Sequence, residues 1–188
     1  PGLEDNVVLV DSVSKRYSMC GARIGALVTR NAEVHQACMR FAMARLSPPT
    51  LAQIAGEAAL QAPPSYFADV KAAYVERRDV LVEGLNAIPG VTVPNPGGAF
   101  YAVARLPIDS SDAFCQWVLS DFHLDGETVM MAPASGFYAT PGAGQNEVRI
   151  AYVLEAGAIR RAVSIIAAAL EVYPGRQQLS ADLQAAVS

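Results

Sequence analysis

The stretch Asp11-Ser12-Val13-Ser14-Lys15-Arg16-Tyr17-Ser18-Met19-Cys20-Gly21-Ala22-Arg23-Ile24-Gly25 decides the fold and the chemistry that this sequence predicts. It connects apolar runs at residues 7–10 and 24–28, and such continuous runs are typical of buried strands. Lys15 lies among serines, and an arginine follows in Gly21-x-Arg23-x-Gly25, whose glycines let the backbone bend and approach a ligand closely. Together these residues predict a site for an anion and a carbonyl compound.

The side chains of this loop indicate what that site could bind. A lysine among small hydroxyl residues at the end of a buried strand is partly desolvated, which lowers its pKa and favours Schiff-base formation with an aldehyde. Ser12, Ser14 and Arg23 carry hydroxyl and guanidinium donors, which suit phosphate oxygens. A surface turn with solvated charges explains the same residue types, so both interpretations stand at this point.

Composition narrows the class of protein. The chain has 188 residues, of which 52% are hydrophobic and 17% charged, so we expect more apolar surface than this chain alone can bury, and hence a partner surface. A net charge of -4 without any run of Lys or Arg argues against nucleic-acid binding. No apolar run approaches the roughly 18 residues that span a bilayer. No signal-peptide pattern is present either, so we expect a cytoplasmic protein without membrane contact.

Cysteines and histidines give no sign of a disulfide framework or a metal site. Cys20, Cys38 and Cys115 are widely spaced and form no Cys-x-x-Cys motif, so we expect them to be reduced. His35 stands three residues before Cys38 on a predicted helix, and His123 lies alone near a turn. Neither arrangement has the spacing of metal ligands, and we predict no metal.

The first half of the chain predicts two strands followed by three helices. Asn31 can cap a helix that ends before Pro48, and an alanine-rich helix then extends to about residue 62. Pro63-Pro64 begins a third helix of more than twenty residues, which ends at Pro89-Gly90. Its length exceeds the mean of about 11–12 residues, so this helix could join two domains, although the pattern taken alone favours a plain surface helix.

The second half predicts a small sheet covered by helices. A hairpin is expected from residues 91–93 and 99–104 around the turn Pro94-Asn95-Pro96-Gly97-Gly98. The elements expected after it are a helix capped by Ser110 or Ser111 and extending to about residue 122, a strand over 128–131, a loop over 133–146, a strand over 147–153 and a helix over 155–172. We therefore predict an α/β protein with the end of one domain over residues 1–63, an interdomain helix over 64–88, a small C-terminal α/β domain over 89–175 and a tail over 176–188.

Two further features could contact a ligand. Arg149 lies on one face of a predicted strand and could clamp a carboxylate with two parallel hydrogen bonds. Taken alone, the pattern favours an edge-strand arginine paired with Glu147 or another acid. Gly97-Gly98 could bring backbone near a ligand, although a hairpin with positive φ explains these glycines and is favoured. P-loop and Gly-x-Ser-x-Gly motifs are absent, which argues against a P-loop nucleotide enzyme and an α/β-hydrolase.

These motifs together resemble the C-terminal part of a fold-type I, class I/II pyridoxal-phosphate-dependent aminotransferase. The residues that carry the resemblance are Ser12-x-Ser14-Lys15, Gly21-x-Arg23-x-Gly25, Gly97-Gly98-x-Phe100 and the late-strand Arg149. The match covers about residues 6–175, and the Lys15 segment is its most specific signature. Residues 131–142 and 147–154 look most like aspartate aminotransferase-like members.

The resemblance implies a role for each of these residues. Lys15 would hold pyridoxal 5'-phosphate as a Schiff base, be displaced by the substrate amine, and move a proton between Cα and the C4′ carbon as general acid and base. Ser12 and Arg23, with Ser14 as a helper, would bind the cofactor phosphate, and Arg149 would bind the substrate α-carboxylate. The implied reaction transfers an amino group between an L-amino acid, with aspartate as a candidate, and a 2-oxo acid.

The resemblance also implies that residues 1–63 end a large cofactor-binding domain whose N-terminal half is absent from this chain. That half supplies the aspartate under the pyridine nitrogen and most of the large-domain sheet in such enzymes. We therefore expect the 188 residues alone to be inactive, and the full-length protein to be a homodimer.

Two alternatives belong to other classes of protein. One is a pyridoxal-phosphate-binding sensor domain of a transcriptional regulator, with a DNA-binding segment upstream, and the other is a non-catalytic interaction domain that keeps the fold. The set of Lys15, Arg23 and Arg149 favours the enzyme over the interaction domain and does not exclude the sensor.

Overall fold

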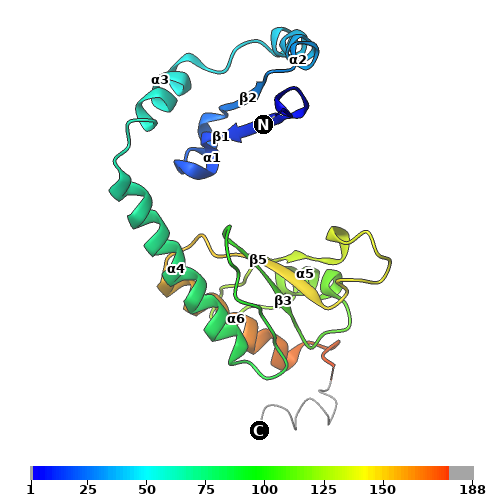
Figure 1. Cartoon of the computed structure of the whole chain (residues 1–188). Helices are drawn as coiled ribbons and strands as arrows, with labels where there is room; N and C mark the ends of the chain where they lie inside the picture. Colours follow the sequence, from blue (N-terminus) through cyan, green and yellow to red (C-terminus); the bar gives the residue numbers. More distant parts are fainter. Residues whose placement is uncertain (1, 178–188) are drawn as a thin grey trace. The chain divides into compact units, whose positions relative to one another are not determined.

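The computed structural model describes residues 2–177, and the chain divides into two compact units, Pro1–Tyr66 and Phe67–Ser188 (Figure 1). Strands and helices alternate in both units, which confirms the predicted α/β class. The assignment of residues 1–63 to a larger domain and of residues 89–175 to a small one stays a prediction. The predicted tail over residues 176–188 lies outside the described residues from residue 178 onward.

The first unit is built around an antiparallel ribbon of two strands. β1 (Val8–Ser12) pairs with β2 (Gly25–Thr29), and the register runs from Val8 opposite Thr29 to Ser12 opposite Gly25. The short 3-10 helix η1 (Glu4–Asn6) precedes β1, while the helix α1 (Val13–Arg16) and the 3-10 helix η2 (Cys20–Ala22) lie in the connection between the strands. The loop singled out in the sequence is therefore the connection of this ribbon.

The prediction that both strands are buried is wrong for this chain. β1 is exposed along its whole length and β2 along most of it, and Val10 is 75% exposed. A two-stranded ribbon has two broad faces, and apolar runs bury both only when other layers cover them. The remaining elements of this unit do not supply those layers.

Two helices complete the first unit. α2 (Ala32–Arg45) begins at the predicted cap, because the Asn31 Oδ1 accepts a hydrogen bond from the Val34 N–H at 3.0 Å. α3 (Thr50–Ala59) follows the predicted proline break and ends a few residues earlier than expected.

The second unit contains a three-stranded antiparallel sheet with the strand order β3-β5-β4. Its strands are β3 (Tyr101–Arg105), β5 (Glu147–Ala151) and the two-residue β4 (Ala132–Pro133). The helices α4 (Pro64–Asn86, which begins at the end of the first unit), α5 (Ser111–Ser120) and α6 (Ala156–Val172) accompany the sheet in Figure 1. The predicted long helix and the predicted Ser110 cap are both present, since the Ser110 Oγ accepts from the Ala113 N–H at 3.3 Å.

The core of the second unit forms between the helices and one face of the sheet. Side chains alternate along β3 and β5, so Ala102, Ala104 and Val148 are buried while their neighbours lie on the opposite face. The buried core also contains side chains from all three helices: Leu81, Leu85, Phe114, Val118, Ile159, Ile166, Ala169 and Leu170. The opposite face of the sheet carries Tyr101, Val103, Arg105, Glu147 and Arg149.

Two predicted strands of the second unit are wrong. Residues 91–93 form a single bridge, Thr92 opposite Arg105, while β3 pairs along its whole length with β5. Two prolines follow residue 93, and a proline has no N–H with which to continue a ladder. Residues 128–131 are not a strand, because pairing with β5 starts only at Ala132. The Thr128 hydroxyl donates instead to the Val118 carbonyl of α5 at 2.6 Å.

The glycines of the predicted hairpin turn lack the backbone conformation that was expected. Neither Gly97 nor Gly98 has a positive φ. The residue with a positive φ in this turn is Ala99, at 59°. A Cβ atom at either glycine would contact nothing within 4 Å. The favoured hairpin interpretation is therefore wrong, because among the described residues neither φ nor space requires glycine at these positions.

Over the described residues, none of the helices is both long enough and apolar enough to cross a bilayer.

The core of the second unit generates a stability prediction. Replacing the fully buried Leu85 by alanine should lower the free energy of unfolding by about 2–5 kcal/mol, since it removes apolar contacts and leaves a cavity. Leu119→Ala is the control, because Leu119 is 48% exposed on α5 and should cost less than about 1 kcal/mol. Urea unfolding followed by the fluorescence of Trp117, which packs against this core, measures both. Equal losses would contradict the assignment of Leu85 to the core.

Candidate functional site

The predicted site begins where β1 becomes α1. Ser12 is both the last residue of β1 and the N-cap of α1, and its Oγ accepts a hydrogen bond from the Ser14 N–H at 3.1 Å. The same Oγ lies 2.8 Å from the Ser14 Oγ and 3.0 Å from the Ile24 carbonyl oxygen, so its single proton is donated to one of these two acceptors. Lys15 follows in the same helical turn. The cap thus holds two hydroxyl groups and the lysine within one turn.

Arg23 lies at the other end of the connection in a left-handed backbone conformation, with φ 55° and ψ 42°. This conformation costs a residue with a Cβ atom roughly 1–2 kcal/mol, and such residues are concentrated at functional sites. The Arg23 guanidinium donates from Nη1 to the Cys20 carbonyl at 2.9 Å. Within residues 2–177 no carboxylate lies within ion-pair distance of it, whereas Arg16 pairs with Asp11 at 2.8 Å.

Only one of the two loop glycines is required by the surrounding structure. A Cβ atom on Gly25 would lie 2.8 Å from the backbone carbonyl oxygen of Asp11, so glycine lets β2 approach β1 closely at this point. A Cβ atom on Gly21 would meet nothing within 4 Å. The close approach that the sequence predicted at Gly25 is therefore made to the neighbouring strand.

Exposure of the site residues differs from the prediction. Ser12, Lys15 and Arg23 are exposed, and Ser14 is half-buried. Because β1 and β2 are themselves exposed, the desolvation of Lys15 expected at the end of a buried strand is not supplied by the residues of this unit.

Arg149 belongs to the second unit, where it lies on the central strand of the sheet. The register places Val103 of β3 and Ala132 of β4 opposite it on the two sides. Its guanidinium carbon lies 4.4 Å from the centre of the Tyr101 ring and 4.6 Å from the centre of the Phe137 ring. Phe137 is the last residue of the 3-10 helix η3 (Ser135–Phe137), which follows β4.

The interpretation of Arg149 as an edge-strand arginine paired with Glu147 is wrong. β5 is the central strand, and Glu147 accepts a hydrogen bond from the Tyr138 hydroxyl and pairs with Arg105 at 3.5 Å. The hydrogen bond to Glu147 raises the pKa of Tyr138. In the part of the chain that the structure describes, no carboxylate lies within ion-pair distance of Arg149.

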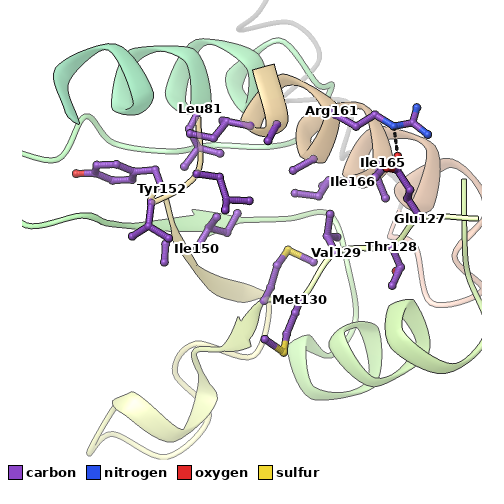
Figure 2. Close-up of a pocket in the computed structure, with 17 residues that line it drawn as sticks. Leu81, Glu127, Thr128, Val129, Met130, Ile150, Tyr152, Arg161, Ile165 and Ile166 are labelled. Atoms are coloured by element: carbon purple, nitrogen blue, oxygen red, sulfur yellow. Dashed lines mark hydrogen bonds and ion pairs between the residues drawn. The ribbon is translucent and has the colours of Figure 1, made fainter. Parts of the chain in front are cut away.

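A separate cavity of about 680 Å³ lies in the second unit between α4, α6 and residues 127–131 (Figure 2). Its lining is mainly aliphatic, and the Arg161 Nε donates to the Glu127 carboxylate at its edge at 2.6 Å. Arg161 also pairs with Asp125 at 3.0 Å, so its charge is compensated. Arg149 does not line this cavity, and the side chains drawn in Figure 2 bring no other polar cluster to it.

The donors of the Ser12–Arg23 loop fit a phosphate group and an aldehyde. Two hydroxyls and a guanidinium without an acidic partner suit phosphate oxygens, and the lysine amine suits a carbonyl carbon. The loop contains one acid, Asp11, which pairs with Arg16, and two further basic residues, Lys15 and Arg23, so its formal charge is positive. Over residues 2–177 there is no group of three or more His, Cys, Asp or Glu side chains that could hold a metal ion.

Comparison with known proteins identifies the family. Residues 2–166 match the family model "Aminotransferase class I and II". An aspartate aminotransferase of Rhizobium meliloti is 33% identical over 181 residues, which cover 90% of this chain and 42% of the relative. An LL-diaminopimelate aminotransferase of Moorella thermoacetica is 33% identical over 165 residues, which cover 87% of this chain and 40% of the relative.

Solved structures agree with this assignment. The crystal structure of the aspartate aminotransferase from Rhizobium meliloti superposes with a TM-score of 0.74 at 30% identity, over 90% of this chain and 43% of that protein. Alanine aminotransferase from Pyrococcus furiosus gives a TM-score of 0.73 at 29% identity, over 86% of this chain and 41% of that one.

The chain therefore belongs to the class I and II aminotransferases, which are pyridoxal-phosphate-dependent proteins of fold type I, as the sequence motifs predicted. It spans about two fifths of the length of the curated relatives that it matches.

The side chains around Arg149 were not predicted from the sequence. Tyr101 could have been placed on the face of Arg149 by the alternation along two paired strands, had the pairing of β3 with β5 been known. Phe137 and Tyr138 lie in a loop of small residues, and no periodicity points to their contacts.

The close approach at Gly25 can be tested by substitution. Gly25→Ala should separate β1 from β2 and destabilise this pairing by roughly 1–3 kcal/mol, because the new Cβ atom would overlap the Asp11 carbonyl. Hydrogen exchange of the backbone amides of β1 and β2 should then become faster. Gly21→Ala is the matched control in the same loop and should leave the exchange unchanged, and equal behaviour of the two variants would refute the steric explanation.

Proposed function

We propose that this chain is part of a pyridoxal-phosphate-dependent aminotransferase that transfers an amino group between an L-amino acid and a 2-oxo acid. The observation that carries the proposal is the loop in which Ser12, Ser14 and Lys15 share one helical turn and Arg23 has no carboxylate partner among residues 2–177. Membership of the aminotransferase family supports it.

The Ser12–Arg23 loop is proposed to bind the cofactor. Pyridoxal phosphate, when bound, supplies an aldehyde that condenses with amines and a ring that withdraws electrons from the bonds at Cα. Ser12 and Arg23, with help from Ser14, would hold its phosphate by charge-assisted hydrogen bonds. The Lys15 Nζ would form the covalent attachment and, once the substrate amine has replaced it, would take the proton from Cα and deliver it to C4′.

Arg149 is proposed to bind the α-carboxylate of the substrate. Its guanidinium is planar and always charged, and it can donate two parallel hydrogen bonds to a carboxylate. Holding the carboxylate in this way would restrict the orientation of the substrate, which removal of the Cα proton requires. Aspartate is the first amino acid to test, because aspartate aminotransferases are among the relatives at 30–33% identity.

The 188 residues alone are proposed to be insufficient for catalysis. Lys15, Ser12 and Arg23 are exposed, and a lysine nucleophile and a phosphate site both depend on surroundings that exclude water. The chain spans 42% of the length of the Rhizobium meliloti relative, and we propose that the full-length protein supplies the other side of the site and functions as a homodimer.

The alternative is a cofactor-binding sensor domain in a transcriptional regulator. Such a protein would bind pyridoxal phosphate through Lys15 and show no amino-group transfer. A helix-turn-helix segment upstream of these residues in the parent polypeptide would support this alternative.

The role of Lys15 is tested in the full-length protein that contains this chain. Lys15→Ala should lower kcat by at least about a hundredfold in a coupled assay with L-aspartate and 2-oxoglutarate, since the variant lacks the covalent anchor and the proton carrier. Lys71→Ala, an exposed lysine on α4, is the control and should retain full activity. Borohydride reduction with pyridoxal phosphate and peptide mapping should place the label on Lys15, and a label elsewhere would contradict the proposal.

The isolated 188-residue chain provides a second test. We expect little or no transamination from it under conditions in which the full-length protein turns over, because Ser12, Lys15 and Arg23 are exposed to water. The coupled assay on equal molar amounts of both proteins measures the difference. A rate of the isolated chain close to that of the full-length protein would show that the site is complete within these residues.

A further inference from the structure

We propose that Tyr101 and Phe137 are positioning residues, which hold the Arg149 guanidinium by its aromatic contacts and leave its N–H groups available to a substrate carboxylate. The proposal rests on the proposed function of Arg149 and extends it to the residues that orient this side chain. It assigns no contact with substrate to either ring.

The two rings reach Arg149 from both neighbours of the central strand. Val103 of β3 lies opposite Arg149. Tyr101 lies two residues before Val103 on the same strand, so its side chain is on the same face of the sheet as Arg149. Phe137 lies on η3, which follows β4 after one residue, and Ala132 of β4 is opposite Arg149 on the other side. The distances of 4.4 Å and 4.6 Å from the guanidinium carbon to the ring centres are within the range of cation–π contacts.

Aromatic contacts suit an arginine that must keep its hydrogen-bonding capacity. The faces of a guanidinium are weakly hydrated and stack on aromatic rings, while its five N–H donors point outward in the plane of the group. An acidic partner would have occupied these donors, and a ring does not. Contacts with two rings therefore restrict the position of Arg149 and leave its two-pronged edge for a carboxylate.

The acid closest along the strand is held by other groups. Glu147 lies on the same face of β5 as Arg149, two residues earlier, and could pair with it if its carboxylate had no other partners. The Tyr138 hydroxyl donates a hydrogen bond to this carboxylate, and the Arg105 Nη2 lies 3.5 Å from it. Tyr138 is the residue after Phe137, so one loop supplies both a ring to Arg149 and a donor to Glu147.

The rings are tested by kinetics of the full-length protein. Tyr101→Leu and Phe137→Leu remove a ring and keep an apolar side chain, and each should raise the KM for the amino acid by about fivefold with a smaller change in kcat. The inhibition constant of succinate, a dicarboxylic acid without an amino group, should rise in parallel. Tyr101→Phe and Phe137→Tyr keep the ring and should restore both constants to nearly the wild-type values.

The network around Glu147 is tested in the same assay. Tyr138→Phe removes the hydroxyl donor, so Glu147 can pair with Arg149 and compete with succinate for it. This substitution should therefore raise the succinate inhibition constant on the order of threefold. The double variant Tyr138→Phe/Glu147→Gln removes the competing charge and should restore it. An unchanged constant in Tyr138→Phe would show that Glu147 is not kept from Arg149 by this hydrogen bond.

A spectroscopic measurement tests the aromatic contacts independently of catalysis. In the 188-residue chain, the Nε–Hε signal of Arg149, assigned by its loss in Arg149→Lys, should be displaced by the ring currents of Tyr101 and Phe137. Each leucine variant should move the signal toward the position of an ordinary arginine, and Tyr101→Phe should leave it displaced. A signal that none of the leucine variants moves would overturn the proposal, whether or not the protein is an active aminotransferase.

The kinetic outcomes separate this proposal from the proposed function. Arg149→Lys loses the two-pronged edge and should raise the KM for the amino acid by about tenfold or more. If it does so while the leucine variants behave like the wild type, the positioning role is wrong and the carboxylate-binding role stands. If Arg149→Lys has no effect while Lys15→Ala is inactive, Arg149 does not bind the substrate, although the enzyme is an aminotransferase.

Discussion

The hydrogen bond from the Ser14 N–H to the Ser12 Oγ is the contact on which the candidate cofactor loop depends. It gives one of the first N–H groups of α1 an acceptor within the protein, at the residue where β1 ends. The same hydroxyl lies within hydrogen-bonding distance of the Ile24 carbonyl beside β2, so one side chain connects the end of one strand, the turn that carries Lys15, and the entry to the other strand. The hydrogen bond that caps α1 therefore also fixes where the side chains of the candidate loop begin.

Arg23 and Arg149 differ in charge compensation from several other arginines, and Arg77 on α4 shares with them the lack of a carboxylate partner within residues 2–177. Arg16, Arg105 and Arg161 each pair with a carboxylate, at 2.8 Å, 3.5 Å and 2.6 Å respectively. Arg23 and Arg149 have no such partner within residues 2–177, and each is held instead by neutral groups, a carbonyl for the first and two rings for the second. An arginine held in this way keeps its charge available to an anion, which is the property that a phosphate or carboxylate site needs.

Features that depend on neighbours in the sequence were predicted well, and those that depend on distant residues were not. The Asn31 and Ser110 caps and the long helix α4 follow from local hydrogen bonding and periodicity. The central position of Arg149 in the sheet was missed, because it depends on the pairing of β5 with both β3 and β4. The positive φ at Ala99, in place of Gly97 or Gly98, was missed because residue type indicates only which backbone conformations are favourable, and tertiary contacts select among them.

The exposure of β1 and β2 and the exposure of Lys15 have one origin. Apolar residues such as Val10 and Val28 remain exposed on the ribbon whose connection carries Lys15, so the ribbon lacks covering layers and the lysine lacks a desolvated environment. Covering the ribbon would bury apolar surface, which is favourable, and would at the same time remove water from around Lys15 and Arg23. Since any group that binds only the completed arrangement also stabilises it, cofactor binding and burial of this ribbon should be thermodynamically coupled. If the loop binds the cofactor as proposed, the hydrophobic strands and the polar loop would be completed in the same step.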